Sequence, residues 1–515
     1  MRYHGRTVPP TRVVLAGLNS WGYRSLAGPL LRNWAFRDPE LAAAVRVDLP
    51  DFDAAADPSD TARRLAEGRY DLAGFSCFVW NAGQVLAVAR ELKRLSPSTT
   101  VVLGGPEAAA TADRLLAREQ SVDLVACGEG EETFAALLRC VALRDRPLSA
   151  VPGLARREGG GVTRSADAPL ISLDGAPPVY EGGAGDPSPV QSLLETSRGC
   201  PFTCSFCDWG PRKMRYVPLP RVASELRALV RRSGYVFLCD ADILMDRARG
   251  AAIMAAFLDA AEGVDCTLHF ETNPAYLTPE AVALIARAPR KFHLSFGVQS
   301  VNPRAHEAVK RGTLDLAKVT ANVDLLRREV PDASYSFSLI YGLPGDDLEG
   351  FRATLDWALR RHAGHFCAGQ LMMIPGADVN RQAAEFAITH QDEAPYQAYE
   401  TATMTRAQMR RARELSVWVG LLLQFKPLLG LVFPRGGDAG PDGAAVERFE
   451  RWVARLQALG VDLTAGLPAA DTDGFRPDER IRAAGERLRA DPLALAAALH
   501  ATRRFADEDA AAWVA

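Results

Sequence analysis

Residues 196–210 read TSRGCPFTCSFCDWG and place Cys200, Cys204 and Cys207 in one short loop. Spacings of four and three positions let a looped backbone direct three thiolates at one small volume, and Gly199 and Pro201 supply irregular backbone angles. A structural zinc site takes four ligands, and no nearby Cys or His completes one. Four cysteines are also usual for an electron-carrying 4Fe–4S cluster, so three would leave one iron open to a ligand. A zinc knuckle or a chance spacing is the competing interpretation.

The cysteine loop opens a series of alternating strands and helices over residues 191–377. The expected strands are Leu193–Ser197, Tyr235–Leu238, Thr267–Thr272, Lys291–Gly297, Tyr335–Tyr341 and Ala368–Met373. Amphipathic segments between them, such as Pro220–Arg232 and Leu316–Glu329, predict helices. Six strand–helix units in a row favour a partial, TIM-like (β/α)6 barrel of parallel strands, with functional residues at the carboxyl ends of the strands.

Residues 1–150 show the same alternation and predict a doubly wound, Rossmann-like α/β domain. Its expected strands are Arg12–Ala16, Val45–Leu49, Leu72–Phe78, Thr100–Leu103 and Leu124–Ala126. Residues 151–190 are rich in Gly, Pro, Asp and Ser, and we interpret them as a linker with a short hairpin. Residues 378–515 are expected to form a helical C-terminal domain, with helices at Thr405–Gln424, Ala444–Leu459 and Arg480–Phe505.

Composition narrows the class of protein. The 515-residue chain has a formal net charge of −3, whereas a nucleic-acid enzyme of this size usually shows a basic surplus, so we expect no nucleic-acid partner. The sequence has no signal-peptide pattern and no apolar run of about 18 residues, which predicts a cytoplasmic protein that does not contact a membrane. The odd number of cysteines, nine, argues against a disulfide framework. Six of them are scattered and are interpreted as small buried residues: Cys77, Cys127, Cys140, Cys239, Cys266 and Cys367.

The Cys-x-x-x-Cys-x-x-Cys pattern after the first barrel strand resembles that of the radical SAM superfamily, over roughly residues 190–375. The resemblance implies that Cys200, Cys204 and Cys207 hold a 4Fe–4S cluster whose open iron binds S-adenosylmethionine (SAM). It further implies that one electron from the cluster cleaves SAM and that Phe206 packs near the adenine.

Other strand ends fit the same resemblance. The segment 295–300 looks like the family's GxQS segment, and residues 340–346 look like its GLPG turn. The resemblance therefore suggests four cofactor contacts, namely Asp240, Glu271, Gln299 and Ser300. Tyr341 is a catalytic candidate and, with Arg215 and Tyr216, a candidate substrate contact, since all three flank predicted loop ends. Asp240 and Glu271 have an alternative role in capping the next helix.

The N-terminal domain is similar to the cobalamin-binding domain of B12-dependent radical SAM proteins. The similarity rests on three segments, Gly74–Phe78, Leu103–Glu107 and Cys127–Glu131. Glycines at strand ends let the backbone approach a large flat corrin. The implied cobalamin contacts are Ser76, Gly104, Gly105, Gly128 and Glu129. Glu129 has the alternative role of favouring a helix N-terminus electrostatically.

One loop departs from the B12 pattern. The usual B12 domain carries Asp-x-His-x-x-Gly after its first strand, where the His binds cobalt from below. Residues 17–22 read GLNSWG here and contain no His. The resemblance then implies base-off cobalamin, with Trp80 as a candidate for the lower face, where its ring would exclude water. Core packing is the equally weighted alternative for Trp80.

Together these resemblances imply a cobalamin-dependent radical SAM C-methyltransferase. It would move a methyl group from methylcobalamin to a carbon of a small-molecule or peptide natural product. The main alternative keeps both cofactors and catalyses a rearrangement, ring contraction or cyclisation without methylation. An RNA methylthiotransferase and a non-catalytic cobalamin or redox sensor are further alternatives. We expect a monomer, an external electron donor such as flavodoxin or ferredoxin, and C-terminal helices, including Trp418, that close over the substrate.

Overall fold

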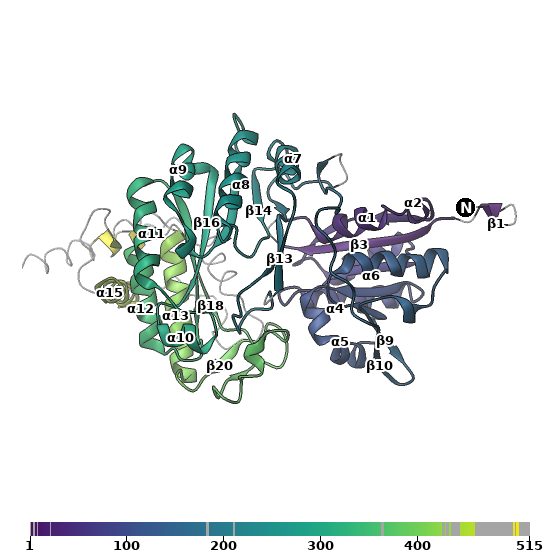
Figure 1. Ribbon diagram of the computed structural model, residues 1–515. Coiled ribbons are helices and arrows are strands. Elements are labelled where there is room, and N and C mark those ends of the chain that lie inside the picture. The colour runs from purple at the N-terminus through teal and green to yellow at the C-terminus, as the bar shows by residue number, and fades with distance from the viewer. Residues whose placement is uncertain are drawn as a thin grey trace, which may run out of the picture.

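The computed structural model describes residues 2–3, 6–7, 9–20, 22–181, 185–209, 212–361, 365–424, 428, 432–433, 443–458, 498–499 and 501–503. Two α/β units lie side by side, with the N-terminal unit on the right of Figure 1 and the second unit on the left. A helical segment covers the far side of the second unit. This arrangement confirms the expected fold class.

The N-terminal unit is built on a parallel sheet. Its strands are β3 (Thr11–Asn19), β4 (Val45–Asp48), β5 (Asp51–Asp53), β6 (Leu72–Ser76), β7 (Thr100–Gly104) and β8 (Leu124–Ala126). The main path runs β4-β3-β6-β7-β8, so the strand order reverses between β3 and β6. In doubly wound sheets, ligands bind outside the carboxyl ends of the strands at this switch point.

Helices cover both faces of this sheet, which explains why its central strands are short, almost continuous apolar runs. They are α1 (Ala27–Ala35), α2 (Pro39–Ala44), α3 (Pro58–Glu67), α4 (Ala82–Leu95), α5 (Pro106–Arg118) and α6 (Gly130–Leu138). Several begin with a capping residue followed by proline; in α3, Asp57 accepts the backbone N–H of Ser59, and Pro58 occupies the first turn. Two antiparallel strands, β9 (Leu154–Glu158) and β10 (Gly161–Arg164), extend the sheet past β8. The two-residue strands β1 (Arg2–Tyr3) and β2 (Arg6–Thr7) pair separately.

The second unit contains six parallel strands that pair in chain order. They are β11 (Ser192–Leu194), β14 (Tyr235–Leu238), β15 (Thr267–Thr272), β16 (Phe292–Gln299), β17 (Ser334–Tyr341) and β18 (His365–Gln370). The outer helices are α7 (Leu219–Val230), α8 (Arg247–Ala260), α9 (Pro279–Arg287), α10 (Pro303–Ala308), α11 (Leu316–Glu329) and α12 (Leu348–Arg360). Leu268 and Phe270 are fully buried under the helices, whereas His269 and Glu271 alternate with them and point into the barrel.

The cysteine loop belongs to neither large sheet. It connects β12 (Ser197–Cys200) to β13 (Arg212–Tyr216), an antiparallel pair in which Arg198 and Arg215 are Cα partners. Figure 1 places β13 between the two units. The loop therefore starts and ends beside the N-terminal unit.

The region after the barrel includes the short pair β19 (Thr389–His390) and β20 (Ala398–Glu400), then the helices α13 (Arg406–Gln424) and α15 (Ala444–Ala458). Asp356 of α12 accepts the backbone N–H groups of Ala445 and Val446 at 2.9 and 3.1 Å and so holds the start of α15. Trp418 is buried and packs edge-on against Trp452 within this helical layer. Most of the expected helix Arg480–Phe505 lies outside the described residues.

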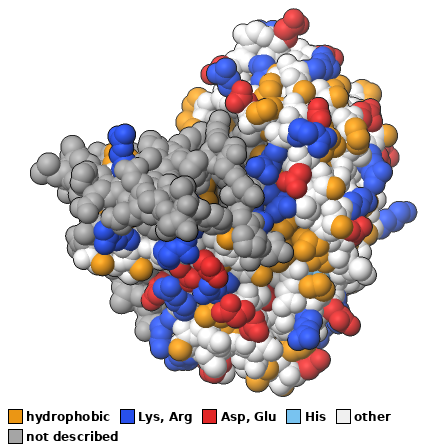
Figure 2. All heavy atoms as spheres, turned by 90° about the vertical axis from the view of Figure 1, so that its left-hand side faces the viewer, with side chains coloured by type: hydrophobic (Ala, Val, Ile, Leu, Met, Phe, Trp, Pro, Cys, Tyr) orange, Lys and Arg blue, Asp and Glu red, His pale blue; other side chains and the backbone are white. Residues whose placement is uncertain are grey.

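Figure 2 shows one face of the molecule, where basic, acidic and apolar side chains are interspersed. Within the described part of the chain, no helix combines the length and apolar character needed to cross a membrane.

The barrel interior contains a row of polar side chains. His269 Nε2 and Ser295 Oγ are 2.7 Å apart, and the His269 ring centroid lies 4.7 Å from those of Phe237 and His293. Burial, with a smaller effect of His293, lowers the pKa of His269 to about 3.

This buried imidazole predicts an acid-sensitive fold. The unfolded chain takes up a proton near pH 6.5, whereas folded His269 stays neutral down to about pH 3. Because the unfolded state binds more protons in this window, the free energy of unfolding should fall as the pH drops. The expected loss is about 2 kcal/mol between pH 6.5 and 5. Urea denaturation of the wild type and of His269→Gln checks this: a variant with the same pH slope would contradict it.

Candidate active site

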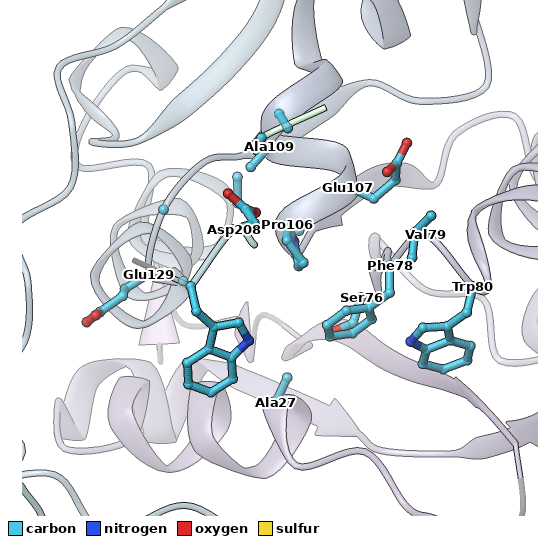
Figure 3. A pocket seen from close by; sticks show the side chains of 18 of the residues that line it. Ala27, Ser76, Phe78, Val79, Trp80, Pro106, Glu107, Ala109, Glu129 and Asp208 are labelled. Atoms are coloured by element: carbon cyan, nitrogen blue, oxygen red, sulfur yellow. The ribbon is translucent and has the colours of Figure 1, made fainter. Parts of the chain in front are cut away.

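A cavity of about 980 Å³ lies between the two α/β units. One wall comes from the carboxyl ends of β3, β6, β7 and β8, and the other from the cysteine loop and the ends of β16, β17 and β18. This is the position that the switch point of the first sheet and the mouth of a parallel barrel both predict. Figure 3 shows part of the cavity, with Phe78, Trp80, Pro106, Glu107, Glu129 and Asp208 around it.

The cysteine loop is fixed by backbone hydrogen bonds on two sides. The Ser205 N–H donates to the Val309 carbonyl at 2.8 Å, and the Val379 N–H donates to the Ser205 carbonyl at 2.7 Å. Cys207 and Phe206 line the cavity. The cysteine loop is therefore anchored without any help from its thiols.

Each of the three sulfurs receives an N–H donor. The Phe202 backbone N–H donates a hydrogen bond to Cys200. The Trp209 backbone N lies 3.5 Å from the Cys207 sulfur, and Arg311 Nη1 lies 3.7 Å from the Cys204 sulfur. Burial, together with the neighbouring cysteines, raises the pKa of the Cys200 and Cys207 thiols. Three half-buried thiols with one donor each suit the thiolates of an iron–sulfur cluster.

No three His, Cys, Asp or Glu side chains among the described residues are grouped for a single metal ion. A cubane differs from such a centre, because each of its cysteines binds a different iron.

Asp240 and Asp242 lie past the end of β14 and are occupied by protein donors. Asp240 accepts the Thr196 backbone N–H at 2.8 Å, the Ser197 hydroxyl at 2.9 Å and the Thr196 hydroxyl at short range. Asp242 accepts the Thr272 hydroxyl at 2.7 Å and the Asn273 N–H at 2.8 Å. Both carboxylates bind the backbone at strand ends. The hydrogen bonds of Asp240 fix the start of β12, the strand that leads to the cysteines.

Glu271 and Gln299 face the interior. The surface of the Glu271 side chain is accessible to solvent. The protein atoms that surround its carboxyl group, and the nearby Asp242, nevertheless raise its pKa. Both observations fit a carboxyl that faces an enclosed hollow inside the barrel. Gln299 lines the cavity with a backbone φ of 62°, just after an irregularity in the pairing of β16. Its buried Oε1 atom has no hydrogen-bond partner in the described structure.

Ser300 and Tyr341 lie behind the cavity wall. Ser300 is fully buried and donates to Asp346 at 2.8 Å. Tyr341 is also fully buried; its ring packs 5.4 Å from that of Phe351, and its hydroxyl lies 3.3 Å from Gln370 Oε1. Ser300 and Tyr341 therefore contact other protein side chains and support the cavity wall from behind.

The predicted corrin contacts gather at the other wall. Ser76, Gly104, Gly105 and Gly128 all line the cavity, and a Cβ atom on Gly128 would find no other atom within 4 Å. Trp80 also lines it and stacks on Phe78 with ring centroids 5.6 Å apart and planes 13° apart. In Figure 3 the two rings stand together below the start of α5. An open, glycine-bordered and mostly apolar hollow fits a large flat macrocycle.

Glu129 lies on the cavity wall in a network of charged residues. This ion-pair network consists of Glu129, Glu131, Glu195, Arg198 and Arg215. Arg215 also donates to the carbonyl of the linker residue Ile171 at 2.7 Å. The guanidinium of Arg215 lowers the pKa of Glu129 against the effect of burial. Glu129 is therefore an ionised carboxylate engaged with the second unit.

Three further side chains, to which the sequence analysis gave no role, contact Cys204 or line the cavity. Arg311 follows α10 and donates to the Gly297 carbonyl at 2.6 Å as well as to Cys204. Asp208 fits against Gly376, where a Cβ atom would lie 2.4 Å from its carboxylate oxygen. Glu107 lines the cavity and accepts the Tyr396 hydroxyl, which Arg114 also contacts. For Asp208 the adjacent Cys207 was an available signal, whereas Arg311 and Glu107 are brought in by distant contacts.

Comparison with known proteins agrees with this geometry. The model of the radical SAM superfamily matches residues 194–358, and that of the B12-binding domain matches residues 40–138. The cobalamin-dependent radical SAM methyltransferase TokK of Streptomyces tokunonensis is 30% identical over 66% of this chain and 52% of its own length. The 2-(S-pantetheinyl)-carbapenam-3-carboxylate methyltransferase of Streptantibioticus cattleyicolor is 29% identical over 67% of this chain and 53% of its own. The chain thus spans about half the length of these two relatives.

Two solved structures share the fold. TsrM from Kitasatospora setae, a radical SAM methyltransferase, superposes with a TM-score of 0.61 at 18% identity over 73% of this chain and 76% of its own. The cobalamin-dependent SAM radical enzyme OxsB superposes with a TM-score of 0.63 at 14% identity over 98% and 80%.

The two matched domains coincide with the two α/β units that border the cavity. The chain therefore contains a B12-binding domain followed by a radical SAM domain. The radical SAM domain implies a 4Fe–4S cluster and SAM, and the B12-binding domain implies cobalamin.

Proposed function

We propose that this protein is a cobalamin-dependent radical SAM C-methyltransferase that acts on a small-molecule or peptide natural product. The observation that carries the proposal is the single cavity shared by the cysteine loop and the glycine-bordered end of the first sheet. When bound, the cluster supplies the electron that cleaves SAM, and cobalamin supplies the methyl group.

The residues that would hold the cofactors lie on opposite walls. We assign the cluster to Cys200, Cys204 and Cys207, with Arg311 donating to Cys204. Phe206, Glu271 and Gln299 would contact SAM, and Ser76, Trp80, Gly104, Gly105 and Gly128 would border the corrin. The remaining apolar lining, which includes Leu339, Ile340 and Leu371 at the barrel mouth, would keep water away from the reacting carbon. An external donor such as flavodoxin or ferredoxin and a cytoplasmic location complete the proposal, because both support reduction of the cluster.

The test is anaerobic reconstitution of the full chain with iron, sulfide and cobalamin, followed by reaction with SAM that carries a deuterated methyl group, with reduced flavodoxin as the electron donor. The first substrate probe is a pantetheinyl carbapenam, since one relative is named for that compound. A product that keeps one deuterated methyl group supports methyl transfer. SAM cleavage with a product of rearranged but unlabelled skeleton would favour the non-methylating alternative, and the absence of SAM cleavage would reject both.

A further inference from the structure

Three carboxylates and two guanidiniums meet where the two α/β units touch beside the cavity. Arg198 Nη2 lies 2.6 Å from Glu131, its Nη1 lies 3.3 Å from Glu129, and its Nε lies 2.8 Å from Glu195. Arg215 forms a bidentate ion pair with Glu129, in which Arg215 Nη1 lies 3.1 Å from Glu129 Oε2 and Nη2 contacts Oε1. The side chains of Glu131, Glu129, Arg198 and Arg215 are only 5%, 12%, 14% and 18% exposed. Buried, charge-assisted bonds of this kind are directional and costly to break on one side only.

The two arginines occupy a special place in the chain. Arg198 lies on β12, two residues before Cys200, and Arg215 lies on β13, just after the cysteine loop ends. They are cross-strand partners, so together they form the base from which the loop extends. Glu129 immediately precedes α6 and Glu131 lies in its first turn, at the edge of the proposed corrin site. The network therefore joins the base of the cysteine loop directly to the opposite wall of the cavity.

We propose that Arg198 and Arg215 are positioning residues that register the cysteine loop against the corrin-binding unit through Glu129 and Glu131. This inference rests on the proposed function, since it assumes a cluster on the loop and a corrin on the first sheet. Among the described residues neither large sheet pairs with β12 or β13, so the ion pairs supply a link that the sheets do not. Their role is to fix the separation and angle between the two cofactors, and with it the efficiency of methyl transfer after SAM is cleaved.

The experiment changes the side of the network that is remote from the cysteines. Glu129→Gln/Glu131→Gln keeps the size of both side chains, but it removes two charges and replaces one acceptor oxygen of each carboxylate with an NH2 donor. We expect the double variant to bind iron normally, because the cysteines and their N–H donors are untouched. The yield of methylated product per SAM cleaved should fall roughly 10-fold to 100-fold, the range expected when reacting groups shift by about 1 Å. Arg198→Lys, which keeps the charge but loses the planar fork, should give an intermediate loss.

A second measurement needs no cofactor and no substrate. In the apoprotein, amide hydrogen exchange of β12 and β13 should be about tenfold faster in the double variant, because the loss of three ion pairs eases local opening. With both cofactors bound, pulsed EPR between the reduced cluster and Co(II) should give a broader distance distribution than in the wild type.

Arg24→Gln is the matched control. Arg24 also joins the N-terminal unit to the segment before the barrel, through Asp186, but neither residue lines the cavity and their side chains are 41% and 71% exposed. Exposed pairs contribute little, so this variant should match the wild type in exchange and in coupling. Wild-type exchange and wild-type coupling in Glu129→Gln/Glu131→Gln would overturn the inference. A wild type that cleaves no SAM would reject the proposed function instead, and the exchange measurement would still decide the inference.

Discussion

Alanine at Cys200, Cys204 or Cys207 is expected to remove the bound iron and to bring SAM cleavage down to the uncatalysed rate. The loss should be roughly a millionfold or more, the usual scale of enzymatic acceleration, because the protein itself has no group that can deliver an electron to SAM. Iron analysis, the absorbance of the cluster and the release of 5′-deoxyadenosine measure the three parts of this result.

The fold should survive these substitutions. The loop is held by backbone hydrogen bonds of Ser205 to Val309 and Val379, which alanine at a cysteine leaves in place. Cys140→Ala is the control, since this half-buried free thiol lies in the first unit, far along the chain from the loop. Full activity in a triple cysteine variant would show that the cluster assignment is wrong.

Gly105→Ala is expected to destabilise the corrin-binding unit by roughly 3 kcal/mol or more. Gly105 has φ +94° and ψ 167°, a conformation that side chains rarely adopt, and it stands just before α5. An added Cβ would lie 2.6 Å from the Cys77 carbonyl oxygen and 3.0 Å from its nitrogen, and neither backbone atom can move cheaply. Denaturant titration of the apoprotein measures the loss, and bound cobalamin should fall with it.

The neighbouring Gly104→Ala separates folding from binding. A Cβ there would lie 3.9 Å from the Ala126 side chain, which is ordinary van der Waals contact. We therefore expect this variant to fold as well as the wild type. Because Gly104 borders the cavity, the methyl group should still weaken cobalamin binding in a spectroscopic titration. Equal stability of Gly105→Ala and Gly104→Ala would show that the turn does not need its glycine.

The sequence predicted the parallel strands well because each carries apolar residues at the positions that pack under the helices. Tyr235–Leu238 and Thr267–Thr272 match their strands at both ends, and the last expected barrel strand, Ala368–Met373, is displaced toward its carboxyl end from the observed β18. The pair β12–β13 escaped notice because Arg212–Tyr216 is strongly basic and carries no apolar alternation. β12 and β13 pair because they flank the cysteine loop, and not because of an apolar pattern in either strand.

The candidate site was predicted in its location but not in every side chain. Strand ends place Asp240 and Glu271 at the same barrel mouth, yet sequence does not tell which way each side chain turns after the strand. Asp240 turns to Thr196 and Ser197, while Glu271 stays on the interior face. The ion pairs of Glu129 join residues 69 and 86 positions apart, and the Arg311–Cys204 contact spans 107. Such contacts follow from the docking of whole units, which local patterns do not encode.

The position of the cysteine loop outside both sheets has a consequence for how the protein matures. Hydrophobic packing and both hydrogen-bonded ladders can be completed while the three sulfurs still carry protons, because none of them is needed to close the architecture. Metal insertion can then come last, onto a chain that has already reached its shape. We expect freshly refolded, iron-free protein to accept iron and sulfide directly, with little change in its circular dichroism in the far ultraviolet.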